Sequence, residues 1–120
     1  MSEFTPAPIK STATFQALEA LDIRVGTIER VEEIARSEKL MKLTVNFGDH
    51  TRCILAGIRK ERENPREIEG KQALFVLNLE PKTMAGEVSE GMLFDLGYAD
   101  GVQPALAVPE RPVPNGTRAG

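Results

Sequence analysis

Residues 40–56, LMKLTVNFGDHTRCILA, alternate apolar and polar side chains up to a Gly-Asp pair and then continue as a second apolar run. A period of two residues is the period of a β-strand with one buried face. The Gly-Asp pair favours a tight turn between two antiparallel strands. This segment therefore predicts a β-hairpin, whose first strand buries one set of side chains: Met41, Leu43, Val45 and Phe47.

Other short segments of the chain have the composition of strands and are bounded by turn residues. In residues 22–32, DIRVGTIERVE, the apolar parity changes after Gly26, which predicts a bulge or sharp bend at that glycine. Residues 72–79, QALFVLNL, are nearly all apolar and predict a strand buried on both faces. In residues 91–97, GMLFDLG, the alternation places Met92 in the core. A further short strand is expected within PALAV, residues 104–108.

A short helix is expected between the third and fourth strands. Asn64 precedes Pro65, Glu67 follows at the third helical position, and Gly70 comes after the last turn. Three strands, a short helix and two more strands are the order of a small Greek-key barrel. The sequence thus predicts an all-β, five-stranded OB-fold barrel, the type that binds oligonucleotides or oligosaccharides, with short terminal extensions.

The chain of 120 residues is long enough for one domain and too short for two ordinary ones. Residues 1–14 are rich in Pro, Ser, Thr and Ala without periodicity, and we expect a flexible tail there. The domain should therefore comprise residues 15–120, beginning with a helical stub that carries Phe15, Leu18 and Leu21. No apolar run has the length of a signal peptide or a membrane span, so we expect a cytoplasmic protein without a membrane partner.

Charge and residue composition exclude several classes of site. A net charge of −3 argues against coating nucleic acid through bulk positive charge, so any nucleic-acid site must be local. The single cysteine, Cys53, excludes an internal disulfide and is expected to be a buried thiol. His50 is the only histidine and lies beside a turn. We therefore expect no catalytic residues, no metal site and no cofactor. The acidic clusters at residues 32–33 and 61–63 are interpreted as solvated faces.

The connection NLEPKTMAGEVSEGM, residues 78–92, is unusually long for a link between two strands, and long connections often carry function. Its Asn-Leu-x-Pro-Lys-x-Met-x-Gly run followed by Ser-x-Gly-Met resembles the tRNA-binding domain family. That family includes the C-terminal domain of methionyl-tRNA synthetases, free-standing dimeric tRNA-binding proteins, eukaryotic synthetase cofactors and export-related chaperones of the CsaA type. The resemblance extends over about residues 15–120 and rests on further segments: LDIRVGTIERVE, EKLMKLTVNFG, AGIRK and PERPVPNGT.

Within the family, two segments point to different branches. ILAGIRK is similar to the tRNA binders, whereas the ending RPVPNGTRAG is similar to the chaperones. The resemblance thus implies a non-catalytic protein that recognises folded tRNA by its shape and its phosphates and assists methionyl-tRNA synthetase in trans. The alternative is a CsaA-type chaperone that binds an unfolded preprotein in export. Aromatic content of 5%, with no paired stacking platform, favours recognition of RNA shape.

Several residues are candidates for contact with RNA. Lys39, Arg59 and Lys82 match the family pattern and would neutralise phosphates. The alternative is that they are ordinary solvated cations. In the long connection, Met84 would pack against RNA at the groove rim, while Asn78 and Ser89 would donate or accept hydrogen bonds. The alternative for Asn78 and Ser89 is that they bond the loop backbone.

Two further expectations concern Arg24 and the oligomeric state. Arg24 is a weaker candidate for contact with RNA, because a carboxylate near the barrel end could pair with it. The resemblance implies a homodimer, since free-standing members of the family are dimers. The helical stub and the stretch ALAVPERPVPNG are apolar where a lone small barrel would expose them, so we expect them to form the interface.

Overall fold

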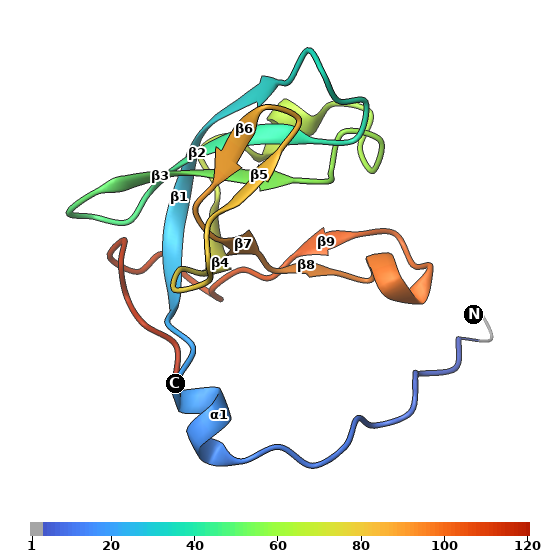
Figure 1. Ribbon diagram of the computed structural model, residues 1–120, viewed down its shortest axis with the longest axis vertical. Helices are drawn as coiled ribbons and strands as arrows, with labels where there is room; N and C mark the ends of the chain where they lie inside the picture. Colours follow the sequence, from blue (N-terminus) through green and yellow to red (C-terminus); the bar gives the residue numbers. More distant parts are fainter. Residues whose placement is uncertain (1–3) are drawn as a thin grey trace.

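A computed structural model describes residues 4–120 as an all-β fold with short helices (Figure 1). Its main sheet has five antiparallel strands in the order β3-β2-β1-β4-β7. The edge strands β3 and β7 contact each other, so the sheet nearly closes into a barrel. The predicted five-stranded OB-fold barrel is confirmed. The strands of this sheet are β1 (Ile23–Glu33), β2 (Met41–Asn46), β3 (Thr51–Ala56), β4 (Gln72–Val76) and β7 (Met92–Leu93).

Strands β2 and β3 form the predicted hairpin, in a register that pairs Leu43 with Ile54. The turn is closed by a hydrogen bond of 2.9 Å from the Phe47 N–H to the His50 carbonyl. Gly48 has a φ of 99°, a left-handed conformation that glycine adopts at little cost. All the side chains expected to share the buried face of β2 and the adjoining turn are buried: Met41, Leu43, Val45 and Phe47.

The expected bulge at Gly26 is wrong in position. The register between β1 and β2 shifts between Ile28 and Arg30, further along the chain than a slip at Gly26 would place it. Gly26 has a different role: a Cβ there would lie 2.6 Å from Val45 Cγ1 and 2.7 Å from a ring carbon of Phe47. The missing side chain thus lets β1 pass close to the inner face of β2.

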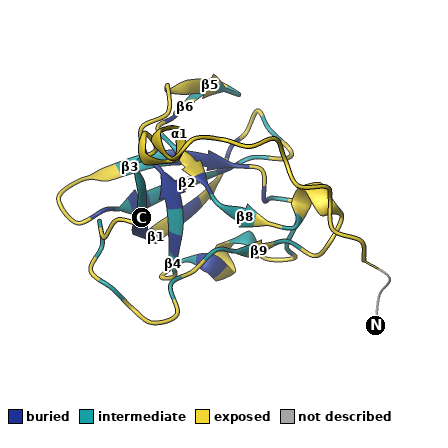
Figure 2. Ribbon diagram, turned by 90° about the horizontal axis from the view of Figure 1, so that it is seen from below, coloured by how far each residue is buried: buried dark blue, intermediate teal, exposed yellow. Residues whose placement is uncertain are grey.

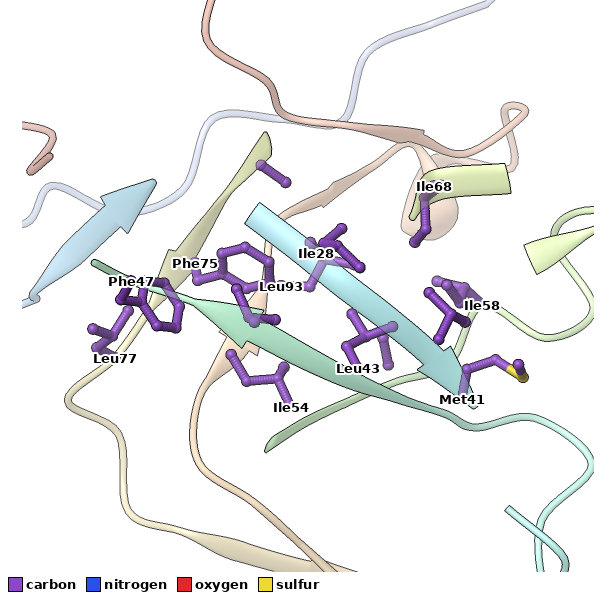
Figure 3. Packing of buried hydrophobic residues seen from close by; sticks show 14 residues of the cluster. Ile28, Met41, Leu43, Phe47, Ile54, Ile58, Ile68, Phe75, Leu77 and Leu93 are labelled. Carbon is purple, nitrogen blue, oxygen red and sulfur yellow. The ribbon is translucent and has the colours of Figure 1, made fainter. Parts of the chain in front are cut away.

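The core lies inside the curved sheet and draws residues from every strand of it (Figure 3). Phe75 is completely buried and meets Phe47 edge to face, with ring centroids 5.4 Å apart and planes at 87°. Edge-to-face contact is a favourable geometry for aromatic pairs. Ile28 and Leu43, from β1 and β2, are also completely buried. Side chains from β1, β2 and β4 thus pack together inside the barrel.

The short helix expected between the third and fourth strands is confirmed as a 3₁₀ helix, η1 (Pro65–Ile68). The Asn64 side chain caps it by accepting a hydrogen bond from the Arg66 N–H. Ile68 is completely buried, and the adjacent Glu69 carboxylate accepts a hydrogen bond of 2.8 Å from the Val31 N–H. The helix therefore covers one end of the barrel beside β1.

Two small sheets complete the fold. The long connection after β4 contains a hairpin of β5 (Lys82–Met84) and β6 (Glu87–Ser89), which the sequence did not predict. After β7 follow β8 (Asp95–Leu96), the 3₁₀ helix η2 (Tyr98–Asp100) and β9 (Ala105–Leu106), which pairs with β8. The strand expected within PALAV is therefore confirmed.

The placement of Met92 in the core is wrong. Its side chain is 44% exposed, whereas its neighbour Leu93 is buried. The reason is the register with β4, which pairs Leu93 with the core residue Phe75. The segment GMLFDLG is also not one continuous strand, because β7 ends at Leu93 and β8 begins at Asp95 with a different partner.

The described part of the tail, residues 4–14, has no helix or strand and is exposed (Figure 2). The first three residues of the expected tail lie outside the described residues. The predicted stub is the helix α1 (Phe15–Glu19), also exposed, beside which the C-terminus lies (Figure 1). The Ala119 N–H donates a hydrogen bond of 2.8 Å to the Ile23 carbonyl, which fixes the C-terminal segment to the start of β1. Within residues 4–120 no helix is long and apolar enough to cross a membrane.

Candidate functional site

The β5–β6 hairpin is fixed to the free edge of β3 by side chains. The Ser89 hydroxyl accepts a hydrogen bond of 3.0 Å from the Leu55 N–H and donates one to the Gly91 carbonyl. The Glu90 carboxylate accepts a hydrogen bond of 2.9 Å from the Cys53 N–H. Arg52 donates hydrogen bonds to the carbonyls of Leu77 and Glu90, near the two ends of the connection. The hairpin is thus held in a defined place against the barrel.

The register of the hairpin sorts its side chains onto two faces. Lys82 pairs with Ser89 and Met84 pairs with Glu87, so these side chains share the face turned toward the barrel. Lys42 on β2 reaches Glu87 at 3.2 Å. The hydrogen bond between these two side chains raises the pKa of Lys42 above its ordinary value. Met84 is half-buried under the hairpin, while Lys82 stays exposed at its edge.

The loop between β1 and β2, residues 34–40, lies against both this hairpin and the end of β3. A Cβ on Gly86, at the hairpin tip, would lie 3.1 Å from Arg36 Nη1. The Arg59 N–H donates a hydrogen bond of 3.1 Å to the Lys39 carbonyl. The Arg59 guanidinium also donates to the Ser37 carbonyl and lies 3.3 Å from the Glu33 carboxylate. Lys39 and Arg59 are therefore brought together at one end of the barrel.

Three cationic side chains of this region lack an acidic partner. Within residues 4–120, no carboxylate lies within ion-pairing distance of Arg36, Lys39 or Lys82. All three are exposed. Sequence reasoning missed Arg36, although its position three residues before Lys39 in the same loop could have drawn attention to it. These side chains carry positive charge that the described part of the fold does not neutralise, despite the net negative charge of the chain.

An apolar groove of about 820 Å³, to which Lys39 contributes, lies between the end of β3 and the segment from β7 to η2. Lys39 and Lys60 line it on one side. Met92 and Tyr98 are exposed along it, so their apolar surface is available to a ligand. The rest of its apolar lining comprises Leu40, Leu55, Ala56, Ile58, Leu93, Phe94 and Ala99.

Asn78 and Ser89 make hydrogen bonds within the fold. The Asn78 side chain accepts from the Asp22 N–H and donates to the Ala20 carbonyl, both at 2.7 Å. It thereby fixes the connection between α1 and β1, at the opposite end of β1 from Glu33 and Arg59. Ser89 is only 4% exposed, and both functions of its hydroxyl are used. Both side chains thus act as backbone partners in this structure, the alternative considered for them. Asn78 is nonetheless exposed, and the contact of these residues with RNA stays a prediction.

Arg24 and Cys53 also contact other parts of the fold. Arg24 donates to both oxygens of Asp22, at 2.8 and 3.1 Å, and this pairing lowers the pKa of Asp22. Arg24 therefore has the carboxylate partner near the barrel end that was the alternative to its contact with RNA. Cys53 is half-buried, not fully buried as expected, and burial raises the pKa of its thiol. In the described chain, no group of three His, Cys, Asp or Glu side chains is placed to hold a metal ion.

Ser89→Ala should lower the free energy of unfolding by about 1 to 3 kcal/mol, because the buried Leu55 N–H would lose its acceptor. Thr83→Ala is the matched control, since Thr83 lies on the exposed face of the same hairpin and should change stability little. Urea unfolding of both variants measures the difference. Equal stability of the two variants would show that the Ser89 hydroxyl does not fix the hairpin.

Comparison with known proteins gives consistent results. Residues 23–118 match the family described as putative tRNA binding domain. A methionine–tRNA ligase of Chlorobium chlorochromatii (strain CaD3) is 42% identical over an alignment of 107 residues, and the alignment covers 86% of this chain. The chain spans 14% of the length of that ligase. The similarity to the ligase is therefore confined to a small part of it.

Three solved structures share the fold over most of this chain. A MetRS related protein from Pyrococcus horikoshii has a TM-score of 0.84 and 33% identity, covering 92% of this chain and 100% of that one. The chaperone CsaA from Bacillus anthracis strain Ames has a TM-score of 0.80 and 32% identity, with the same coverage of 92% and 100%. The C-terminal domain of Plasmodium vivax p43 has a TM-score of 0.72 and 32% identity, covering 82% and 58%. From its sequence and its fold, this chain belongs to the putative tRNA-binding domain family.

Proposed function

We propose that this protein binds folded tRNA without modifying it, using the surface formed by the 34–40 loop, the β5–β6 hairpin and the apolar groove. The observation that carries the proposal is the set of exposed, unpaired cations on the 34–40 loop and the β5–β6 hairpin in a protein of net negative charge, as judged over residues 4–120. Membership of the tRNA-binding domain family supports it. Because tRNA is used in the cytoplasm, the proposal includes a cytoplasmic protein.

The cations would supply the affinity. A lysine or arginine that meets a phosphate releases condensed counterions, which is the main sequence-independent source of affinity for nucleic acids. Lys39, Lys82 and Arg36 can do so without first breaking an ion pair. Arg59 would act partly by holding the 34–40 loop through the Ser37 carbonyl, and partly through its own half-buried charge, which pairs with Glu33 in the free protein.

The groove would supply complementarity to the shape of the RNA. Met92 and Tyr98 expose an adaptable thioether and an aromatic ring on its wall, and such groups pack on the faces of unstacked bases. Met84 is half-buried in the β5–β6 hairpin and does not line the groove, so it would contact RNA from the hairpin. Two methionines and one tyrosine form no continuous stacking platform, so binding should depend on the folded shape of the RNA and little on its sequence.

A second candidate function is binding of unfolded polypeptide. It is favoured by the apolar lining of the groove and by the similarity to solved CsaA chaperones. Apolar segments of an unfolded preprotein could bury side chains in the same groove. The unpaired cations Arg36, Lys39 and Lys82 distinguish the two candidates, because burial of apolar side chains does not require them.

An association with methionyl-tRNA synthetase is part of the first proposal. The similar methionine–tRNA ligase from Chlorobium chlorochromatii contains a segment like this chain within a much longer protein. Acting in trans, these residues would raise the affinity of a synthetase for tRNA by holding the RNA beside the enzyme.

A filter-binding titration with bulk tRNA and with a reduced, unfolded polypeptide separates the two functions. We expect tRNA to bind more tightly, with log affinity falling linearly as log salt rises, because phosphate contacts release counterions. Burial of apolar side chains depends little on salt in this range. Tighter binding of the polypeptide, or tRNA binding that is indifferent to salt, would contradict the proposal.

We further propose that the protein is a homodimer, and Leu18→Asp should make it a monomer. Leu18 is 58% exposed on α1, next to exposed Phe15 and Leu21, in a groove whose other wall is the C-terminal segment 118–120. A charge there would oppose burial against a second copy. Val88→Asp is the control. Val88 is similarly exposed, but it lies on the β5–β6 hairpin, so this variant should remain a dimer. Sedimentation equilibrium of the unmodified chain at a mass near 13.2 kDa would contradict the dimer.

A further inference from the structure

Two carboxyl groups meet in the wall of the apolar groove. Glu61 lies in the segment after β3, and Asp95 is the first residue of β8. Both line the groove and both are half-buried. Their side chains are within hydrogen-bonding reach of each other. The acidic cluster at residues 61–63, which the sequence predicts to be a solvated face, is therefore partly enclosed at Glu61.

Each of these two carboxyl groups has an oxygen that needs a hydrogen. Glu61 Oε1 and Asp95 Oδ1 are buried, and neither accepts a hydrogen bond from any residue between 4 and 120. Two ionised carboxylates within hydrogen-bonding reach repel each other, and neither of the buried oxygens would have a donor. A single proton between them removes one charge and supplies the missing hydrogen bond. We propose that Glu61 and Asp95 share one proton, and that this proton joins two walls of the groove and adjusts its affinity for RNA to pH.

The surroundings of the pair agree with this arrangement. Burial, together with the hydrogen bond to Asp95, raises the pKa of Glu61 to about 7, against an opposing effect of Arg62. Arg62 Nη1 pairs with Glu67 at 3.0 Å, while its buried Nε has no hydrogen-bond partner between residues 4 and 120. Lys60 lies 3.8 Å from Glu38 and is exposed. The remaining titratable groups along the groove are Lys39 and Tyr98.

The shared proton connects segments that are distant in sequence. The Gln103 side chain donates a hydrogen bond of 3.1 Å to the Glu61 carbonyl, so the segment after β3 and the segment around η2 meet at a second point. Loss of the proton would leave two negative charges in contact. The repulsion would separate the two segments and widen the groove, and the extra charge would lower the electrostatic potential at Lys39 and Lys60.

The sign of the effect on stability follows from linkage. The pKa of Glu61 is raised in the folded state, from 4.5 to about 7. Its contribution to stability is therefore complete below the unfolded value and is lost as the pH rises through about 7. The effect on RNA binding, which rests on the proposed function, has the same direction. A bound polyanion favours the protonated pair, so affinity should fall as the pH rises.

The first experiment tests the shared proton without RNA. A carbon-13 NMR titration of the side-chain carboxyls should show Glu61 titrating near neutral pH. The variant E61Q replaces the protonated carboxyl with a neutral amide. In urea unfolding, the free energy of unfolding of the unmodified protein should therefore exceed that of E61Q by less as the pH rises. E63Q is the matched control, because exposed Glu63 lies two residues away. A Glu61 that titrates below about pH 5, the range of an ordinary glutamate, would overturn the shared proton.

The second experiment measures bulk tRNA affinity at about pH 6 and about pH 8, on either side of the titration. The unmodified protein and E63Q should lose about three- to tenfold in affinity across this range, whereas E61Q should change little. Any pH dependence that arises elsewhere in the protein would remain in E61Q. Equal pH dependence in all three proteins would overturn the link to RNA, even if tRNA binds. Absence of tRNA binding would contradict the proposed function instead, and the first experiment would still decide whether the proton is shared.

Discussion

Phe75→Ala should lower the free energy of unfolding by about 3 to 5 kcal/mol. Phe75 is completely buried, and its ring contacts Phe47 edge to face. Truncation removes this contact and leaves a cavity that the sheet cannot close, because β4 is paired on both sides, with β1 and with β7. For a domain whose total stability is of the order of 5 to 15 kcal/mol, this loss is large. Urea unfolding of the purified variant measures it.

Phe4→Ala provides the control for this substitution. Phe4 is 48% exposed in the N-terminal segment, outside the barrel. The same change of side chain should therefore leave the urea midpoint nearly unchanged. A loss below about 1 kcal/mol for Phe75→Ala would be typical of a surface site and would show that the ring is not the centre of the core.

Reversing two charges, with Lys39→Glu and Lys82→Glu in one protein, should weaken tRNA binding by about 10- to 100-fold at low salt. Each lysine is exposed and lacks an acidic partner within the described chain. The salt dependence should also decrease, by about one unit of the log–log slope for each phosphate that a lysine no longer neutralises. Filter binding at several salt concentrations measures both quantities.

A double variant with the same change of net charge tests whether position matters. Lys10 and Lys71 are both exposed, and neither belongs to the groove or the hairpin. Lys10→Glu with Lys71→Glu should therefore reduce affinity much less. If both double variants show the same decrease in affinity and in salt slope, only net charge matters, and the proposed surface is wrong.

The barrel could be predicted from the sequence because its strands are specified locally. The alternation from Met41 to Phe47 fixes which face of β2 is buried, and the Gly-Asp turn fixes the direction of β3. The capping residue Asn64, directly before Pro65, similarly marks the start of η1. These signals lie within a few residues of the structure that they specify.

The errors arose where a contact distant in sequence decides the outcome. Met92 follows the expected alternation, but the pairing of Leu93 with Phe75 turns it outward. Ser89 and Asn78 bond to Leu55 and Ala20, partners that no local pattern relates to them, while their contact with RNA stays a prediction. The Glu61–Asp95 pair likewise joins residues far apart in the chain. Register and side-chain partners of this kind depend on the completed fold.

The covered edge of β3 has a consequence for aggregation. An edge strand with free N–H groups is a template onto which a strand of another molecule can add. Here the outward N–H groups of Cys53 and Leu55 are occupied by the side chains of Glu90 and Ser89. The connection that carries the β5–β6 hairpin therefore also blocks strand addition between molecules. Without it, the incompletely closed sheet would leave the edge of β3 open.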